Sequence, residues 1–318
     1  MNGNMPVSSP TFRFDILAMA DLCFDIIISG PDAPQFNQVE LLVDDYIIDL
    51  GGSVGIFACQ FAKLGGTIAL LGNVGKDIPG QIIIDRLKGA GVETSLISVY
   101  DGEKTAMGLN LFCKGDRAML TCLGVMDQSI PAIFSAALSH KAKHWHIGGY
   151  FLLRELIHTW PVWVQTLKAQ GVSISLDTNW DPSGKWENVY ALLPMIDIFL
   201  PNEAEAMAIS GKKNITEAGL FLAEVCPLVV IKMGEQGAMV FKQGNENYYP
   251  LPASLTAALH IVDTTGAGDN FDAGFIFSWL SGAAESSCIE NAFRCAVSSL
   301  TGLGGIAKQI VNKTDLKL

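Results

Sequence analysis

The sequence lacks a cluster of basic residues. Its 318 residues include 21 Lys and Arg against 32 Asp and Glu, which gives a formal net charge of −11. Binding to a polyphosphate chain requires a basic stripe on the protein surface, so we expect no nucleic acid partner. A small phosphorylated ligand is not excluded, because a few backbone amides, one or two cations and a metal ion are enough to hold it.

The sequence also lacks the marks of membrane and secreted proteins. Its longest apolar segments are interrupted by Asp or Gly well before the ~20 residues that a membrane span needs. The first residues, MNGNMPVSSPTFRF, contain no charged leader followed by an apolar stretch. The seven cysteines form no CxxC pair and are odd in number, as expected for small buried side chains in a reducing compartment. We therefore expect a cytoplasmic protein without a membrane partner.

Two widespread nucleotide-binding motifs are absent as well. A dehydrogenase would carry Gly-x-Gly-x-x-Gly between its first strand and first helix, where this chain has Ala20-Asp21-Leu22. The Gly-x-x-x-x-Gly-Lys-Ser/Thr motif of P-loop kinases does not occur in the sequence. The sequence therefore disfavours both classes.

What the sequence has is an apolar pattern in which strands and helices alternate. The apolar fraction is 49% and the charged fraction 17%, typical of a compact globular protein. Residues 1–13 are expected to form a flexible lead, and residues 14–318 a single domain. We expect strands at Phe14–Ala20, Thr67–Leu71, His144–Ile147, Ser173–Leu176, Ile196–Leu200, Leu228–Lys232 and Gly237–Lys242, and helices at Val54–Leu64, Gln81–Gly89, Thr159–Ala169 and Glu203–Ile209. This alternation predicts an α/β fold with a mostly parallel sheet and helices on both faces.

Two segments differ from that alternation. Residues 20–50 contain an expected strand at Tyr46–Leu50, and residues 100–125 carry β-prone sequence around the turn Lys114-Gly115-Asp116, which predicts a hairpin. We expect these segments to form a small sheet that stands apart from the main one.

The most specific motif is a glycine-rich turn that leads into a helix, Asp263-Thr-Thr-Gly-Ala-Gly-Asp269-Asn-Phe-Asp-Ala-Gly-Phe. Gly266, Ala267 and Gly268 would present backbone N–H groups without bulky side chains. With the positive end of the helix dipole, these groups form an anion hole suited to a phosphoryl group. Asp269 lies beside that hole, where it could accept a proton from an attacking hydroxyl. An ordinary helix start is the alternative for a short Gly-x-Gly-Asp, but the whole run is far more specific.

This run resembles the C-terminal signature of the ribokinase-like (pfkB-type) carbohydrate kinase family, and other motifs agree in the expected order from about residue 14 to 305. The resemblance implies a three-layer α/β/α fold with a mostly parallel central sheet and a small β-sheet lid. It implies ATP-dependent phosphorylation of a hydroxyl, with Asp269 as the catalytic base and Gly266, Ala267 and Gly268 as the anion hole.

The resemblance also implies a substrate site. Ala20-Asp21-Leu-Cys-Phe-Asp25 is similar to the Gly-Asp-x-x-x-Asp opening of the family, whose acidic residues bind substrate hydroxyls. Gly51-Gly52-Ser53 resembles the N-terminal signature, and the segment Thr105–Arg117, which contains Asn110, resembles the lid that covers the substrate.

Asn202-Glu203-Ala-Glu205 follows an expected strand and opens a helix. Asn202 and Glu205 lie on one helix face, so both could address a hydrated metal ion. A capping box, in which each residue bonds the backbone of the other, is the alternative. The family has an Asn-x-x-Glu motif for metal and phosphate at this location, so the resemblance favours a Mg²⁺ role.

The turn at Lys232–Gly237 and the turn that begins at Asp263 complete the expected cofactor site. Lys232-Met-Gly234-Glu-Gln-Gly237 lies between two expected strands, where glycines let the chain pass close to a ligand. The resemblance implies that Lys232, Gly234 and Gly237 border ATP. A K⁺ ion near Asp263 and Thr265 is also expected, because turn carbonyls and an acid suit it.

At two positions the chain departs from the family. Asp177-Thr-Asn179-Trp-Asp181 resembles the Asp-x-Asn-x-Arg stretch of fructokinase-like and ketodeoxysugar-kinase-like members. Because Asp181 replaces the Arg, no cationic clamp is expected there, whereas Asn179 remains a candidate contact for phosphate or metal. Ile56 stands where the family usually has a sugar-binding Asn, which removes an amide contact to a hydroxyl. This change disfavours ribose-like recognition.

The acceptor is expected to be a small, unphosphorylated sugar-like molecule. Phosphosugar kinases of the family tend to carry a Lys around the Asn-x-x-Glu motif, where this chain has Leu200-Pro201. A nucleoside kinase is the first alternative, with an apolar face for the base made by Phe24, Met107, Leu109 and Met119. A catalytically silent regulator that binds a sugar or nucleotide is the second, and the retention of Asp269 speaks against it.

The resemblance further implies a homodimer formed through the lid. Leu111, Met119 and Leu123 of the expected hairpin would be exposed apolar side chains that need cover.

Overall fold

The computed structural model describes residues 13–30, 32–43, 45–113, 116–128, 141–312, 314 and 316. Residues 1–12 of the expected lead and Lys114-Gly115 of the expected hairpin turn lie outside the described residues. Among the helices that are described, none is long and apolar enough to span a membrane.

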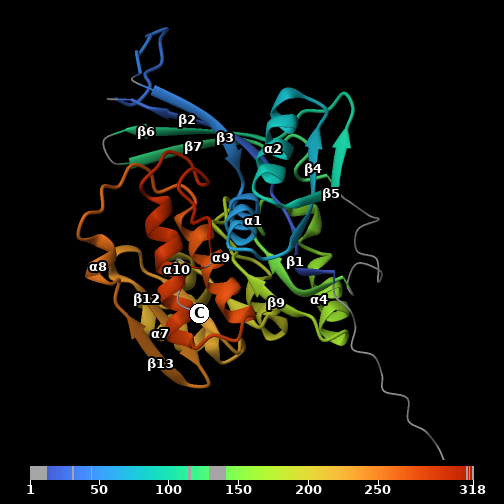
Figure 1. Ribbon diagram of the computed structural model, residues 1–318, viewed down its shortest axis with the longest axis vertical. Helices are drawn as coiled ribbons and strands as arrows, with labels where there is room; N and C mark the ends of the chain where they lie inside the picture. The colour runs from blue at the N-terminus through green and yellow to red at the C-terminus, as the bar shows by residue number, and fades with distance from the viewer. Residues whose placement is uncertain are drawn as a thin grey trace, which may run out of the picture.

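A nine-stranded sheet runs through the middle of the molecule (Figure 1). Its strands, in spatial order, are β13 (Asn245–Tyr249), β12 (Ala238–Lys242), β11 (Val229–Lys232), β10 (Ile198–Phe199), β9 (Ser173–Leu176), β8 (Ala142–Ile147), β1 (Phe14–Met19), β4 (Ile68–Gly75) and β5 (Glu93–Tyr100). From β11 to β5 every neighbouring pair is parallel, and β12 and β13 add antiparallel pairings at one edge. Parallel neighbours need long crossover connections, which are usually helices.

The central strand β1 separates two apolar cores. Ile16 and Ala18 belong to one cluster of buried side chains, whereas Leu17 and Met19 belong to the other, because successive side chains of a strand point to opposite faces. A strand that is buried on both faces needs a nearly continuous apolar sequence, and FDILAM provides it.

Helices cover both faces of the sheet and complete the three layers. The core around Ile16 includes side chains of α1 (Ser53–Lys63), α2 (Ile78–Gly89), α9 (Ala267–Leu280) and α10 (Glu285–Ser299). The core around Leu17 includes side chains of α4 (Trp160–Ala169), α5 (Val189–Leu192), α6 (Glu203–Ser210) and α7 (Ile215–Ala223). A short helix α8 (Ala253–Thr256) and the 3₁₀ turns η1 (Arg154–Leu156), η2 (Leu193–Met195) and η3 (Gly234–Gln236) lie in the connections.

A second, four-stranded sheet stands apart from the main one, at the top of Figure 1. Its order is β3 (Asp45–Gly51), β2 (Cys23–Ser29), β6 (Met107–Cys113) and β7 (Asp116–Cys122). We call this sheet the lid. The strands come from the two segments that were expected to supply it, and the three-layer fold with a small separate sheet is confirmed. The domain boundaries at residues 1–13 and 14–318 stay predictions.

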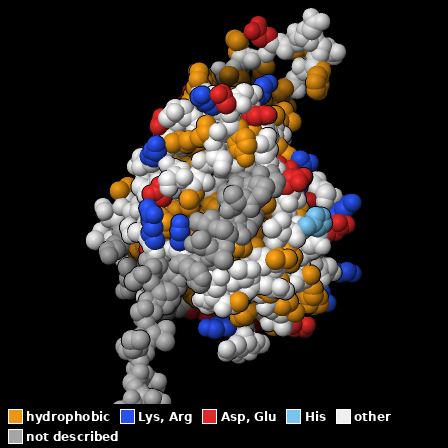
Figure 2. Space-filling view, turned by 90° about the vertical axis from the view of Figure 1, so that its right-hand side faces the viewer, with side chains coloured by type: hydrophobic (Ala, Val, Ile, Leu, Met, Phe, Trp, Pro, Cys, Tyr) orange, Lys and Arg blue, Asp and Glu red, His pale blue; other side chains and the backbone are white. Residues whose placement is uncertain are grey.

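The connection from β2 to β3 projects beyond the lid. It forms the protruding tip at the top of Figures 1 and 2. Its apolar side chains are exposed, including Phe36 at 93% and Leu42 at 82%.

Asp77 ties α2 to the start of β6. Its carboxylate accepts hydrogen bonds from the Gly80 N–H (2.9 Å), which caps α2, and from the Thr105 N–H (2.9 Å). Thr105 in turn donates through its hydroxyl to Asp77 and accepts from the Gly75 N–H at 2.8 Å. The Gly75-x-Asp77-x-x-Gly80 turn is therefore a joint between the main sheet and the lid.

Candidate active site

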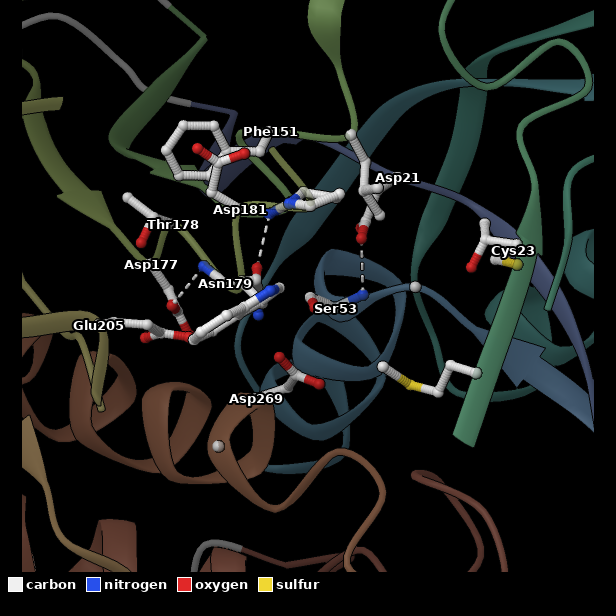
Figure 3. A pocket seen from close by; sticks show the side chains of 18 of the residues that line it. Asp21, Cys23, Ser53, Phe151, Asp177, Thr178, Asn179, Asp181, Glu205 and Asp269 are labelled. Carbon is white, nitrogen blue, oxygen red and sulfur yellow. Dashed lines mark hydrogen bonds between the residues drawn. The ribbon is translucent and has the colours of Figure 1, made fainter. Parts of the chain in front are cut away.

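Polar residues gather where the parallel strands end. A cavity of about 1180 Å³ lies there, bounded by the lid, the strand ends and the N-terminus of α9 (Figure 3). All but two of the site residues expected from the sequence line this cavity. They are Asp21, Asp25, Gly52, Ser53, Asn110, Asn179, Asn202, Glu205, Lys232, Gly234, Thr265, Gly266, Ala267, Gly268 and Asp269. Gly51 and Gly237 do not line it.

Asp21 follows β1 and holds the start of α1. Its two carboxylate oxygens accept hydrogen bonds from the N–H groups of Ser53 (3.0 Å) and Val54 (2.9 Å). Burial raises the pKa of Asp21 to about 6, although these hydrogen bonds oppose the rise. Gly52 has a φ of 84° and a β-carbon there would overlap the Asp21 carbonyl oxygen. A β-carbon at Gly149 would lie 2.6 Å from the Asp21 carboxyl carbon, so two glycines enclose this acid.

Asp25 lies in β2 and packs against two glycines of the lid. A β-carbon at Gly51 would overlap the Asp25 carboxyl group, and one at Gly108 would lie 2.5 Å from its Oδ1. Gly51 therefore makes room for Asp25 without lining the cavity itself. The Cys23 thiol donates to Asp25, and burial together with this negative charge raises the pKa of the thiol far above its usual range.

Asp269 lies in the first turn of α9. Gly266 is the N-cap residue that precedes the helix and has a φ of 72°, and no side chain of the described residues caps the helix. The first-turn N–H groups thus face the cavity as a site for negative charge. Burial raises the pKa of Asp269 to about 8, the charges of Asp177 and Asp21 add to the rise, and Lys232 and a hydrogen bond with Ser53 oppose it.

Asp263 and Ile56 hold the turn before α9 in place. The buried Asp263 carboxylate accepts from the Thr265 N–H, the Thr265 hydroxyl and the Gly304 N–H, each at 2.8 Å. A β-carbon at Gly266 would lie 2.9 Å from Ile56 Cγ2. Ile56 is only 3% exposed, so this departure from the family motif packs under the glycine turn.

An ionic cluster joins the ends of β9 and β11 to α9. Lys232 Nζ lies 2.8 Å from Asp177 Oδ2 and 3.2 Å from both carboxylate oxygens of Asp272. Burial alone would lower the pKa of Lys232, but the two acids raise it above its usual value. The ammonium group also lies 3.4 Å from the β-carbon position of Gly268. A fixed cation therefore stands beside the glycine turn.

Asn202 and Glu205 form a capping box at the start of α6. The Asn202 N–H donates to Glu205 Oε2 at 2.8 Å, and the Glu205 N–H donates to Asn202 Oδ1 at 2.9 Å. The alternative derived from the sequence is thus present, and both side chains also line the cavity. Burial, and then the charge of Asp177, raise the pKa of Glu205 to about 7.

The loop after β9 carries several cavity residues. Asn179 Oδ1 accepts from the Gly149 N–H at 2.8 Å. Asp181 accepts four hydrogen bonds of 2.7–3.0 Å from the N–H groups of Ser183, Lys185 and Trp186 and from the Ser183 hydroxyl. Burial would raise the pKa of Asp181, but these bonds lower it. In place of a cationic clamp, Asp181 holds the loop in shape.

Gly234 and Gly237 have different structural roles. Gly234 has a φ of 54° and lines the cavity. Gly237 has a φ of 101°, and a β-carbon there would overlap the Tyr249 carbonyl oxygen at the end of β13. Gly237 thus allows two chain segments to touch and lies outside the cavity lining.

Of the side chains expected to form an apolar face for a base, Met119 lines the cavity, whereas Phe24 is buried in the core.

Comparison with known proteins identifies the family. The family model described as pfkB family carbohydrate kinase matches residues 22–311. The chain belongs to this family. The expected class of ATP-dependent carbohydrate kinase is therefore confirmed.

The chain is also similar to individual proteins. Ribokinase from Arabidopsis thaliana is 28% identical over 280 residues, which cover 84% of this chain and 71% of the relative. The structure of adenosine kinase from Sinorhizobium meliloti has a TM-score of 0.80 at 23% identity, covering 94% of this chain and 98% of that one. A putative ribokinase II from E. coli in complex with ATP and Mg²⁺ has a TM-score of 0.80 at 23% identity, covering 95% and 97%. Both of these structures have the same fold as this chain.

Thr178 and Asp272 of this pfkB chain were not among the site residues expected from the sequence. Thr178 is fully buried, lines the cavity, and its Oγ1 has no hydrogen-bond partner among the described residues. Asp272 does not line the cavity but pairs with Lys232, which does. It could have been found, because it follows Asp269 by three residues on the same helix and so shares its face.

Proposed function

We propose that this pfkB-family chain transfers the γ-phosphoryl group of ATP to a hydroxyl of a small, unphosphorylated sugar or sugar-like acceptor. In this proposal Asp269 is the general base, and the backbone amides of Gly266, Ala267 and Gly268 form the anion hole. The observation that carries it is the position of Asp269 in the first turn of an uncapped helix, hydrogen-bonded to Ser53. Ser53 donates its own N–H to Asp21.

The proposed acceptor site lies between the lid and β1. Asp21, Asp25 and Asn110 all line the cavity and all offer oxygen atoms to hydroxyl groups. An acceptor held there presents a hydroxyl toward Asp269, which takes its proton while the oxygen forms the bond to phosphorus. The terminal phosphoryl oxygens would face the amides at the start of α9, with Lys232 beside them.

Asn202 and Glu205 fit a hydrated Mg²⁺ ion. Glu205 is a buried carboxylate on the cavity, and its Oε1 lies outside the capping box. Mg²⁺ is usually held by one or two carboxylates, its own waters and substrate phosphates, and when bound it neutralises charge on the transferring group. A cation beside Glu205 would also lower the pKa of this acid and keep it ionised.

The K⁺ ion remains part of the proposal. Asp263 is buried beside Thr265, and its carboxylate fixes the turn whose carbonyls would supply the other ligands. Equal rates of ADP release in K⁺ and in choline salts would remove this ion from the account.

The substitution Asp269→Asn tests the central assignment. It keeps the size and the Ser53 contact but removes the base, so ADP release that depends on an acceptor should fall by about 10²–10⁴-fold. Screening hexoses, keto-acids, polyols and nucleosides with Mg-ATP identifies the acceptor, and the exposed Asp85→Asn serves as the matched control. If Asp269→Asn turns over at the wild-type rate, the base is another group. If the wild type binds a sugar yet releases no ADP with any acceptor, the silent regulator is the correct reading.

A nucleoside acceptor is the second candidate. It is favoured by the apolar and aromatic side chains that line the cavity away from Asp269, namely Leu123, Met126, Phe151, Leu152, Ile157 and Trp180.

A further inference from the structure

The cavity extends well past the acids that would bind hydroxyl groups. Its volume of about 1180 Å³ also includes the part proposed to hold ATP and Mg²⁺, so the extension is identified by its lining residues. The extension is bounded by the lid end at Leu123 and Met126, by the segment 151–158 and by the loop 178–188. Figure 3 places Phe151 on the opposite side of the cavity from Asp269.

Two aromatic side chains, Phe151 and Trp180, line this extension, and Trp186 packs behind them. Trp186 lies between Phe151 and Trp180, with ring centroids 5.5 Å and 5.2 Å away and interplanar angles of 89° in both pairs. Such edge-to-face contacts fix the orientation of rings. Phe151 is anchored from behind by an edge-to-face contact with the buried Tyr150. We call Phe151, Trp180 and Trp186 the aromatic wall.

Trp180 is left open to the cavity by this arrangement. It lines the cavity and is 58% exposed, although a Trp side chain is large and apolar. Its backbone neighbour Asn179 bonds the N–H of Gly149, which packs on Asp21. Trp180 therefore lines the same cavity as Asp21 and follows, in sequence, a residue that contacts the proposed hydroxyl site.

The backbone of the loop is held in an unfavourable conformation. Asn179, Trp186 and Asn188 have φ values of 55°, 56° and 70°. Positive φ is uncommon for residues with a side chain and a real outlier for a bulky one such as Trp. The four hydrogen bonds to Asp181 hold this shape. Strain of this kind persists where the placement of a loop serves a ligand.

We propose that the aromatic wall selects an acceptor in which the phosphorylated sugar carries a flat apolar ring, and that this ring stacks on Trp180. The inference rests on the proposed phosphoryl transfer and adds to it the part of the acceptor that Asp21 and Asp25 do not address. Stacking on an indole tolerates different rings because every flat π-face is suitable. A glycoside with an aromatic aglycone and a nucleoside share this chemistry.

Matched acceptor pairs test the proposal. Inosine is compared with D-ribose, and phenyl β-D-glucopyranoside with methyl β-D-glucopyranoside, by ADP release with Mg-ATP. In at least one pair the ring-bearing member should have the higher kcat/KM. Trp180→Ala should lower the ratio of kcat/KM between the two members about tenfold, mainly through KM, and Trp180→Phe should restore most of it. Val162→Ala, an exposed position on α4, should leave the ratio unchanged.

Equal kcat/KM within both pairs, or an equal loss on both members in Trp180→Ala, would overturn the stacking role while leaving the kinase proposal intact. If no acceptor releases ADP, the kinase proposal fails and binding decides the inference by itself. Quenching of tryptophan fluorescence by inosine or the phenyl glucoside, weakened in Trp180→Ala and kept in Trp180→Phe, would then support it. Absence of binding by both ring-bearing compounds would contradict the stacking role of Trp180.

Discussion

At the scale of the residue, the proposed base is notable for its environment. Asp269 shares the cavity with Asp177 and Asp21, and burial with these charges raises its pKa to about 8. A base must be unprotonated to accept a proton, so the reactive fraction of the free protein increases as the pH rises through this value. A base is most effective when its pKa lies near the working pH.

We therefore expect kcat/KM to rise by up to about tenfold per pH unit below pH 8 and to level off above it. The profile should be measured by ADP release between pH 6 and 9.5 at low acceptor and saturating Mg-ATP. A flat profile over that range would contradict a catalytic base with a pKa near 8.

Ile56 has neighbours of two kinds. Its side chain packs against the turn of Gly266 and against Gly305, and it also lines the cavity. The loss of a sugar contact at this position stays a prediction. We expect that Ile56→Asn destabilises the protein by about 1–3 kcal/mol, because it buries an amide without partners. Urea unfolding measures this loss. Ile56→Val, which removes only a methylene, should cost about 0.5–1.5 kcal/mol. If Ile56→Asn keeps its stability and gains turnover on ribose, the position belongs to the sugar site after all.

At the scale of the element, the sequence predicted best where periodicity and turn chemistry agree. The central strands and the helices α1, α2, α4 and α6 were expected within a few residues of their observed bounds. The glycine-rich run that begins at Asp263 predicted where α9 starts, because a glycine turn followed by an acid is typical of a helix N-terminus. The same local signals predicted most of the candidate site, since the ends of parallel strands meet at one edge of a sheet.

Other elements were not recognised. β13, NENYY, is a mostly exposed edge strand with little apolar patterning. β2 lies in the segment 20–50, which was expected to contribute to the small sheet, but no strand was named there before Tyr46. β5 was not expected as a strand, and it pairs in parallel with β4 at one edge of the main sheet. Contacts between distant segments, such as those that join Asp272 to Lys232 or Asp181 to Trp186, depend on the folded chain and have no signature in local sequence.

Lys232 acts as a link between β11, the end of β9 and α9. Lys232→Met leaves Asp177 and Asp272 buried without their cation, which should cost about 3–5 kcal/mol of unfolding free energy. Lys242→Met, at an exposed position at the end of β12, is the matched control and should change stability by less than about 0.5 kcal/mol. Equal unfolding midpoints for the two variants would mean that the acids become protonated at little cost.

At the scale of the whole molecule, the lid presents an apolar outer surface. Tyr46, Ile48 and Leu120 are 42–64% exposed, and the projecting connection adds Phe36. Met119 lies on the opposite face, which lines the cavity. Of the positions expected to need cover, Met119 is 59% exposed, while Leu111 and Leu123 are half-buried.

We expect this surface to be covered by a second copy of the chain. Light scattering at micromolar concentration should give the mass of two chains, and Ile48→Glu with Leu120→Lys should reduce it to one. A single-chain mass for the wild type would contradict the predicted homodimer.

The two glycines that enclose Asp21 have an evolutionary consequence. Gly52 and Gly149 leave no space for a longer side chain beside Asp21. Almost every substitution of these two glycines should therefore impair the protein. The aromatic wall, which stands on a loop fastened by Asp181, has no such restriction. Descendants of this protein should therefore acquire new acceptors by exchanging residues of that loop while the floor of the cavity stays constant. A saturation library would record this as a sharp contrast in tolerance between two neighbouring walls of one cavity.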